Sequence, residues 1–80
     1  MTAQEFRGVF NAQPFRPFTV HLADGRAVAV PHQEYALLSP TGRTLIVYED
    51  DDSFQVLDLM LATGVQVNGK RFKKVKKKSD

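Results

Sequence analysis

The 80-residue chain contains no cysteine. Without cysteine it has no disulfide to stabilise a small fold, no thiol nucleophile and no cysteine ligand for zinc. A chain of this length buries only about 60% of the surface that it exposes when unfolded. Self-association is therefore the natural remaining source of stability, and the lack of cysteine fits a reducing cytoplasm.

Long apolar runs are also missing. No stretch reaches the length of about 18 apolar residues that a membrane-spanning helix needs. The first seven residues, Met-Thr-Ala-Gln-Glu-Phe-Arg, lack the basic start and the apolar centre of a secretion signal. We therefore expect a cytoplasmic protein that makes no contact with a membrane.

Charge is distributed unevenly, although the net charge is only +2. Residues 1–69 contain four arginines and eight carboxylates, and we interpret them as one small domain. Residues 70–80 form a basic tail that we expect to be disordered, with a single carboxylate. The basic side chains of this tail are Lys70, Arg71, Lys73, Lys74, Lys76, Lys77 and Lys78.

The N-terminal segment carries the signature of a helix. Thr2-Ala3-Gln4-Glu5 fits a capping box, in which the threonine hydroxyl accepts a backbone hydrogen bond and the glutamate reaches back to the cap. Phe6, Val9 and Phe10 follow at the spacing of one helical face. We predict a short helix over about residues 3–12, stabilised by packing this apolar stripe on a sheet.

The clearest local signal is Asp24-Gly25 between two short apolar runs, which favours a hairpin with a two-residue turn. Such a turn pairs His21 with Val28. One face of the hairpin then carries Phe18, Val20, Leu22, Ala27 and Ala29, and the other carries Thr19, His21, Val28 and Val30. Because both faces are partly apolar, we predict a bent hairpin that is covered on both sides, as in a small closed barrel.

Further strand patterns follow along the chain. Residues 44–48 are β-branched and aromatic, so this strand is expected to be central. Residues 35–38 either continue the second strand or form a new one. Strands are also predicted at 54–57 and 62–67, turns at 39–42 and 49–53, and a tight turn that Asp58 caps.

These elements predict a mainly β fold. The favoured arrangement is a short N-terminal helix followed by a five-stranded, strongly bent antiparallel small barrel of the SH3-like or Sm-like type. The alternative is a helix packed on a twisted, open antiparallel sheet.

Several short motifs occur together over residues 14–67. They are Pro14-Phe15-Arg16-Pro17-Phe18, Leu22-Ala23-Asp24-Gly25-Arg26, Pro31-His32, Ser39-Pro40, Gly42-Arg43-Thr44 and Val56-Leu57-Asp58-Leu59. As a set they resemble a group of small bacterial proteins of unassigned function. The resemblance implies no activity, because none is assigned to that group.

The order of elements also resembles that of the Sm-like proteins, which include the bacterial RNA chaperone Hfq. This resemblance lies in element order and implies a bent five-stranded barrel with RNA as a ligand. In Hfq the turn between the last two strands carries a Tyr-Lys-His motif that contributes to RNA binding. Here the comparable stretch reads Val56-Leu57-Asp58-Leu59, with an acidic residue where a basic one is needed, which argues against RNA binding at this turn.

The basic tail is the candidate nucleic-acid site. Lysine and arginine side chains that neutralise phosphates release counterions, which gives a salt-dependent affinity without sequence preference. The alternative is a solvated tail that only increases solubility, since Phe72 is its single aromatic residue for base stacking.

Metal sites are weakly indicated. His21, His32 and Glu34 supply suitable ligand types, but the two histidines lack a third ligand at a fixed spacing. The four adjacent carboxylates at 49–52 lack the alternation and the glycine of an EF-hand loop. We predict no metal and no cofactor.

Catalytic patterns are weaker still. Ser39 and Ser53 lie in predicted turns without a histidine at a revealing spacing, and Asp58 is better explained as a cap. We therefore do not expect an enzyme. The leading hypothesis is a non-catalytic binding module that contacts RNA or DNA through its tail and associates with itself through a strand edge, 54–57 or 65–67. The alternative is a protein-interaction or regulatory subunit whose partner docks on the helix or on residues 35–38.

Overall fold

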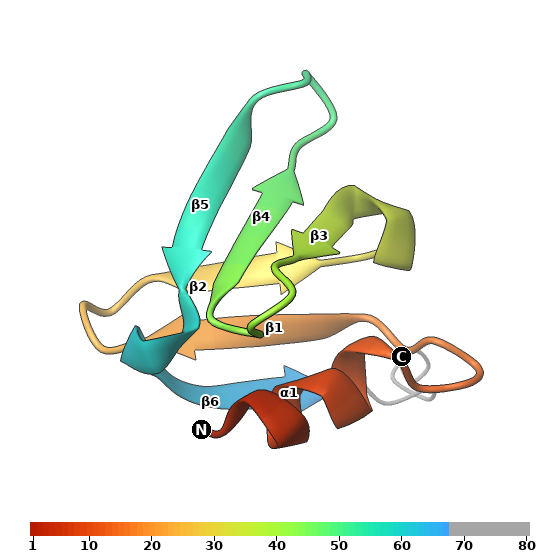
Figure 1. The fold of residues 1–80 in the computed structure, drawn as a ribbon. Helices are drawn as coiled ribbons and strands as arrows, with labels where there is room; N and C mark the ends of the chain where they lie inside the picture. The colour runs from red at the N-terminus through yellow and green to blue at the C-terminus, as the bar shows by residue number, and fades with distance from the viewer. Residues whose placement is uncertain (68–80) are drawn as a thin grey trace, which may run out of the picture.

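The computed structural model describes residues 1–67 and is mainly β, with a short N-terminal helix (Figure 1). The elements are α1 (Ala3–Phe10), β1 (Phe18–Leu22), β2 (Ala27–Val30), β3 (Ala36–Leu38), β4 (Thr44–Tyr48), β5 (Phe54–Asp58) and β6 (Ala62–Val67). Two single 3₁₀ turns lie between strands, η1 (Gln33–Tyr35) and η2 (Leu59–Leu61). No helix within residues 1–67 is long and apolar enough to cross a membrane.

The six strands form two antiparallel sheets of three strands each. The order is β2–β1–β6 in the first sheet and β3–β4–β5 in the second sheet. The expectation of five strands in a closed barrel is therefore not confirmed for residues 1–67. Pro31 and η1 interrupt the chain after β2, so that β3 becomes a separate strand that pairs with β4. Proline removes a backbone donor, which explains why the ladder of the first sheet stops there.

The β1–β2 hairpin has a longer turn than the Asp-Gly pair predicts. The backbone N–H of Leu22 donates to the carbonyl of Arg26 over 2.9 Å, and that of Gly25 donates to the carbonyl of Leu22 over 3.0 Å. Gly25 has φ +94°, which is the left-handed residue that ends a three-residue hairpin loop. His21 consequently lies opposite Ala27, and the predicted pairing with Val28 is wrong by one residue.

A shift of one residue moves every side chain of a strand to the other face of the sheet. The buried face of the hairpin carries Phe18, Val20, Leu22, Val28 and Val30. The other face carries Thr19, His21, Ala27 and Ala29, all exposed or half-buried. The first sheet is thus buried on one face only, and the prediction of a hairpin covered on both sides is wrong.

The core lies between the inner faces of the two sheets. Its buried residues are Phe6, Phe18, Val20, Leu22, Val28, Val30, Leu45, Val47, Leu57, Leu59 and Ala62. Burial of each large apolar side chain of this kind contributes about 1.5–3 kcal/mol. None of the polar or charged side chains of residues 1–67 is buried.

Helix α1 links the two sheets. The ring of Phe6 packs edge-on against that of Phe18 in the first sheet, with 5.6 Å between ring centroids. On the other side, Arg7 Nη2 donates to the carbonyl of Pro40 over 2.7 Å, in the turn between β3 and β4. The predicted capping box at the start of the helix is confirmed. The helix ends at Phe10, two residues earlier than predicted, where Gln33 Nε2 donates to the last carbonyl.

The remaining local predictions hold. Gly42 N–H donates to the carbonyl of Ser39 over 2.9 Å, which confirms the turn at 39–42. Strand β4 is the central strand of its sheet, as its composition indicates, and β6 spans the predicted residues 62–67. Asp58 Oδ1 accepts from Met60 N–H over 2.9 Å and caps η2, as expected.

Candidate functional site

The outward face of the second sheet is apolar. Side chains alternate along β4, so Leu45 and Val47 point into the core, and Ile46 and Tyr48 point outward. The strand register places apolar neighbours beside both outward residues. We call the resulting surface the outer apolar face; it consists of Leu37, Ile46, Tyr48, Phe54 and Val56.

These side chains are exposed to an unusual degree for their size. The exposed fraction is 61% for Leu37, 58% for Phe54, 57% for Val56 and 44% for Tyr48, and Ile46 is half-buried. The Tyr48 and Phe54 rings are neighbours across the strand pair, tilted by 48° with 5.7 Å between centroids. Single exposed apolar residues are common in proteins, whereas a contiguous group across three strands marks an interaction surface.

The outward face of the first sheet is different. It carries polar or small side chains, among them Thr19, His21 and Gln66. His21 Nε2 and Gln66 Oε1 lie 3.2 Å apart and are hydrogen-bonded across β1 and β6. Because its side chains are polar or small, this face can stay exposed to water without a partner.

Four carboxylates at the end of the β4–β5 hairpin border the outer apolar face. We call residues 49–52 the acidic tip. Tyr35 Oη donates to Asp50 Oδ1 over 2.8 Å, and this bond raises the pKa of Tyr35. Ser53 Oγ donates to Asp51 Oδ1 over 2.6 Å, and this bond lowers the pKa of that carboxyl. The tip is therefore held in shape while its charges face solvent.

A shallow hollow joins the acidic tip to the first sheet. Ala29 and Pro31 line it from the end of β2, and Tyr35, Tyr48, Glu49 and Asp50 line it from the other side. Because Tyr48 belongs to the outer apolar face, the apolar surface continues into a hollow with two tyrosine rings and two carboxylates. Aromatic faces and carboxylates together attract lysine and arginine side chains.

Strand β5 is an edge of the second sheet, because its one partner among residues 1–67 is β4. The bonds from Glu49 N–H to Ser53 and from Leu59 N–H to Arg43 frame the β4–β5 ladder. Hydrogen bonding alternates along antiparallel strands, so the backbone groups of Phe54, Val56 and Asp58 point away from β4. Within residues 1–67 they have no backbone partner, so they can pair with an added strand beside the apolar side chains.

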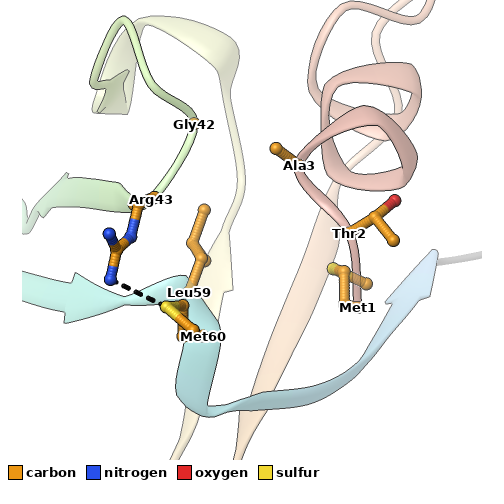
Figure 2. A pocket seen from close by; sticks show the side chains of 7 residues that line it. All are labelled: Met1, Thr2, Ala3, Gly42, Arg43, Leu59 and Met60. Atoms are coloured by element: carbon orange, nitrogen blue, oxygen red, sulfur yellow. Dashed lines mark hydrogen bonds between the residues drawn. The ribbon is translucent and has the colours of Figure 1, made fainter.

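A second hollow lies at the opposite end of the sheet (Figure 2). It is lined by Met1, Thr2, Ala3, Gly42, Arg43, Leu59 and Met60. Arg43 Nη2 donates to Met60 Sδ over 2.8 Å, as the dashed line in Figure 2 shows. The volume is about 60 Å³, which is room for one or two water molecules and too little for a metabolite.

The candidate ligands and nucleophiles of the sequence have local structural roles. His21 bonds Gln66, and the His32 ring lies 5.3 Å from that of Tyr35. No group of three histidine or carboxylate residues within residues 1–67 is arranged to hold a metal ion. Ser39 Oγ accepts from Thr44 N–H over 3.1 Å, and so shapes a turn.

The predicted nucleic-acid site lies outside the described residues. All seven of its side chains belong to residues 68–80, so the tail hypothesis stays a prediction from sequence. All four predicted docking surfaces, the helix and residues 35–38, 54–57 and 65–67, fall on the described part, and two of them contribute to the outer apolar face. Leu37, from the predicted 35–38 surface, and Val56, from the predicted 54–57 edge, lie on the outer apolar face.

Ile46 and Tyr48 were missed as functional residues by reasoning from sequence. Their strand is apolar at nearly every position, which is typical of a central strand buried on both faces. A usable signal was present in the neighbouring segment, 54–57, which also has apolar residues on both faces of the strand. Because a small sheet has only one core to face, one of its two apolar faces has to be exposed.

Comparison with known proteins assigns no family. No family model, no curated protein and no solved structure matches the chain significantly. The resemblances to a group of small bacterial proteins and to the Sm-like proteins therefore stay predictions. What the chain does has to be inferred from the surfaces described above.

Proposed function

We propose that this chain is a small non-catalytic binding module that docks on another polypeptide through the outer apolar face. The observation that carries the proposal is the exposure of Leu37, Phe54 and Val56, each more than half open to water on one sheet face. Covering such side chains removes apolar surface from water, at about 25 cal/mol per Å². Aromatic side chains such as Tyr48 and Phe54 are favoured anchors of protein interfaces.

The chemistry of the partner follows from the surroundings of this face. The acidic tip and the hollow beside Tyr48 favour a partner segment with lysine or arginine near apolar residues. The open backbone groups of Phe54, Val56 and Asp58 also suit an extended segment that adds a strand to β5. A second copy of the chain is one polypeptide that fits the predicted edge pairing.

The proposal includes a small barrel of the SH3-like or Sm-like type, opened between β2 and β3. In its favour, the pairing order is β6–β1–β2 followed by β3–β4–β5. This is the order of a single bent five-stranded sheet whose second strand is broken between Val30 and Ala36. The shared core between the two sheets agrees with this interpretation.

Site-specific cross-linking tests the docking proposal. A photoreactive phenylalanine analogue replaces Phe54 on the outer apolar face in one sample and Ala27 on the outward face of the first sheet in another. We expect discrete polypeptide adducts from position 54 only, and we expect Val56→Lys in the same molecule to remove them. Equal adducts from both positions, or none from position 54, would contradict the proposal. An adduct of twice the chain mass would identify a second copy as the partner.

A second candidate function is nucleic-acid binding through residues 70–80, favoured by seven basic side chains within eleven residues. Titration with random single-stranded and duplex oligonucleotides tests it. Affinity should fall steeply between low and physiological salt because binding releases counterions. Replacement of Lys73, Lys74 and Lys76 by glutamine should flatten this salt dependence. An oligonucleotide affinity that changes neither with salt nor with these substitutions would rule out the tail as the binding site.

A further inference from the structure

We propose that a second copy of this chain adds its own β5 to the free edge of β5, antiparallel, with Val56 opposite Val56 at a two-fold axis. The inference rests on the proposed function, because it names the polypeptide that supplies the added strand. The two second sheets would join into one, with the outer apolar faces of both copies on the same side. Three observations support a second copy: the composition of the edge, the register, and the groups that this register brings together.

The composition of β5 leaves its edge unprotected. Proteins commonly protect exposed strand edges with proline, glycine, charged side chains or very short strands. Among the edge strands of residues 1–67, β2 ends directly before Pro31, β6 contains Gly64, and β3 has three residues. Residues 54–57 of β5 include no proline, glycine or charged residue. Figure 1 shows β5 at the outer border of the second sheet, in a hairpin that projects away from the first sheet.

The acidic tip decides the direction of the added strand. In a parallel pair, residues 49–52 of the two copies would lie side by side, and the four carboxylates of each tip would repel those of the other. An antiparallel pair places the two tips at opposite ends of the interface. Antiparallel pairing of the same strand from both copies also gives the two-fold symmetry that is usual for a dimer of identical chains.

The open backbone groups decide the register. They lie at Phe54, Val56 and Asp58, so the centre of the edge is Val56. With the two-fold axis there, the two Val56 residues exchange N–H to carbonyl bonds. The Asp58 N–H of each copy then donates to the Phe54 carbonyl of the other copy. A register shifted to either side would set one of these positions against a loop.

This register brings an exposed ring to an open hollow. The hollow has a volume of about 450 Å³ and lies where β4 begins and β5 ends, lined by Thr41, Arg43, Thr44, Val56, Leu57 and Asp58. Phe54 of the second copy would lie opposite Asp58, on the same sheet face as Thr44 and Val56. The Phe54 side chain is 58% exposed in the single chain. Placing it in the hollow of the other copy removes apolar surface from water, and symmetry repeats the contact.

The same register brings opposite charges together. Arg43 Nη2 donates to Met60 Sδ beside this hollow (Figure 2). The single ion pair within residues 1–67 joins Arg26 to Asp24, so no carboxylate of these residues pairs with Arg43. Continued past the end of β5, the register sets Met60 opposite Asp52 of the second copy. The acidic tip of each copy is thereby directed toward Arg43 of the other.

The mass of the full chain in solution tests the association. One pair of short strands belongs to the class of interfaces that bury less than about 1,200 Å², so we expect a reversible dimer. Sedimentation equilibrium should show a mass that rises with concentration from that of one chain toward that of two. A mass that stays at one chain up to about 1 mM would overturn the proposal.

Proline substitution tests the role of the β5 edge. Val56→Pro removes the N–H at the centre of the edge and leaves the β4–β5 ladder intact, so the dimer should dissociate about tenfold more readily. Ala27→Pro makes the same change on the free edge of β2 and should leave the association unchanged. Circular dichroism checks that both variants fold. Equal weakening by the two variants would reject pairing through β5.

Single cysteines report the register, because the chain has no native cysteine. The Cα atoms of opposed Val56 residues would be about 5.5 Å apart, which a disulfide can span. Under mild oxidation Val56→Cys should form disulfide dimers. Leu37→Cys should not, although Leu37 is 61% exposed, because β3 lies at the other border of the sheet. Equal dimer yields from the two positions would contradict the proposal, whether or not Val56→Pro folds.

Mixed cysteine variants distinguish this register from a shifted one. Phe54→Cys chains mixed with Asp58→Cys chains should form mixed disulfide dimers in preference to dimers of either variant alone. A preference of Phe54→Cys chains for one another would overturn the register.

Charge reversal tests the contact of Arg43 with the acidic tip. Arg43→Glu should weaken the dimer about two- to tenfold, because symmetry places the contact at both ends of the interface. Arg16→Glu is the matched control, since it changes the net charge equally at a position before β1. The control should have a smaller effect, and equal weakening by both would contradict the proposed register.

The cross-linking experiment at position 54 separates this inference from the proposed function. A chain that stays monomeric while position 54 still cross-links to other polypeptides would reject the second copy as the partner, and the proposed function would stand. A monomeric chain without any adducts from position 54 would reject both. Adducts of twice the chain mass, lost in Val56→Pro and kept in Ala27→Pro, would support both.

Discussion

The two sheets of this protein have matching inner faces and contrasting outer faces. Both present alternate apolar residues to one shared core. Outward, the first sheet shows Thr19, His21 and Gln66, whereas the second shows Leu37, Phe54 and Val56. Folding alone accounts for the inner faces, because their side chains leave water when the sheets pack. It leaves the apolar outward face of the second sheet unexplained, and we propose docking on another polypeptide as the reason.

The largest expected effect is the difference in lost stability between truncating a leucine on the inner face and one on the outer face of the second sheet. Leu45→Ala removes a fully buried side chain and should lower the free energy of unfolding by about 2–5 kcal/mol. Leu37→Ala removes the same atoms from an exposed position on the neighbouring strand and should cost less than about 1 kcal/mol. Urea unfolding measures both. Similar losses would mean that Leu37 is covered by this chain in its resting state and would break the comparison.

The next effect concerns the way α1 holds the second sheet to the first. A Cβ atom at Gly42 would lie 2.8 Å from Ala3 Cβ, and Gly42 has φ +78°. Gly42→Ala should therefore cost about 1–3 kcal/mol through strain and crowding. Gly64→Ala is the control, since nothing lies within 4 Å of its added Cβ. In thermal unfolding, the melting temperature of Gly42→Ala should be well below that of the control. Equal melting temperatures would show that the helix is not in tight contact with this turn.

A smaller effect compares the two hairpin ends. Gly25 in the first sheet and Asp52 in the second occupy the same place in three-residue loops, with φ +94° and +71°. A residue with a Cβ atom is strained there, so Asp52→Gly should raise the free energy of unfolding by up to about 1 kcal/mol. Gly25→Ala should lower it by about the same amount. If Asp52→Gly destabilises the protein, the carboxylate at position 52 has a stabilising contact that the loop geometry does not explain.

The smallest effect is a dependence on pH that both hairpin ends share. The backbone N–H of Arg26 lowers the pKa of Asp24, and the hydroxyl of Ser53 lowers that of Asp51. Because each pKa lies below the ordinary value of 3.8, this stabilisation is present above that pH and is lost as the pH falls through the folded-state values. Urea unfolding between about pH 5 and pH 2.5 should show the decrease. Ser53→Ala should reduce it, and an unchanged pH profile would contradict the role of this hydroxyl.

Local chemistry made much of the fold predictable. The capping box at Thr2 and Glu5, the cap at Asp58 and the last strand depend on neighbours in sequence, and all three are confirmed. The β1–β2 register was not predictable from the Asp-Gly pair, because two- and three-residue loops both accept glycine at positive φ. That error of one residue exchanged the two faces and suggested closure where the first sheet is open on one side.

The candidate site was only partly visible for a related reason. Leu37 and Val56 belong to segments that sequence alone marks as docking surfaces, but their alignment with Ile46 depends on pairing across three strands. The register of these strands depends on the tertiary fold, because loops of different length connect them. Since β4 and β5 carry apolar residues on both faces, the sequence leaves open which face packs against the core. The structure resolves this by burying Leu45, Val47 and Leu57.

The most direct test of the central claim is cross-linking from position 54, measured with and without Val56→Lys, alongside the free energy of unfolding. Val56 is 57% exposed, so its replacement by lysine should change stability by less than about 1 kcal/mol. We expect the polypeptide adducts to disappear while the protein stays folded, because a charge in the middle of the face blocks docking. Adducts that persist unchanged in folded Val56→Lys would contradict the assignment of this face as the docking surface.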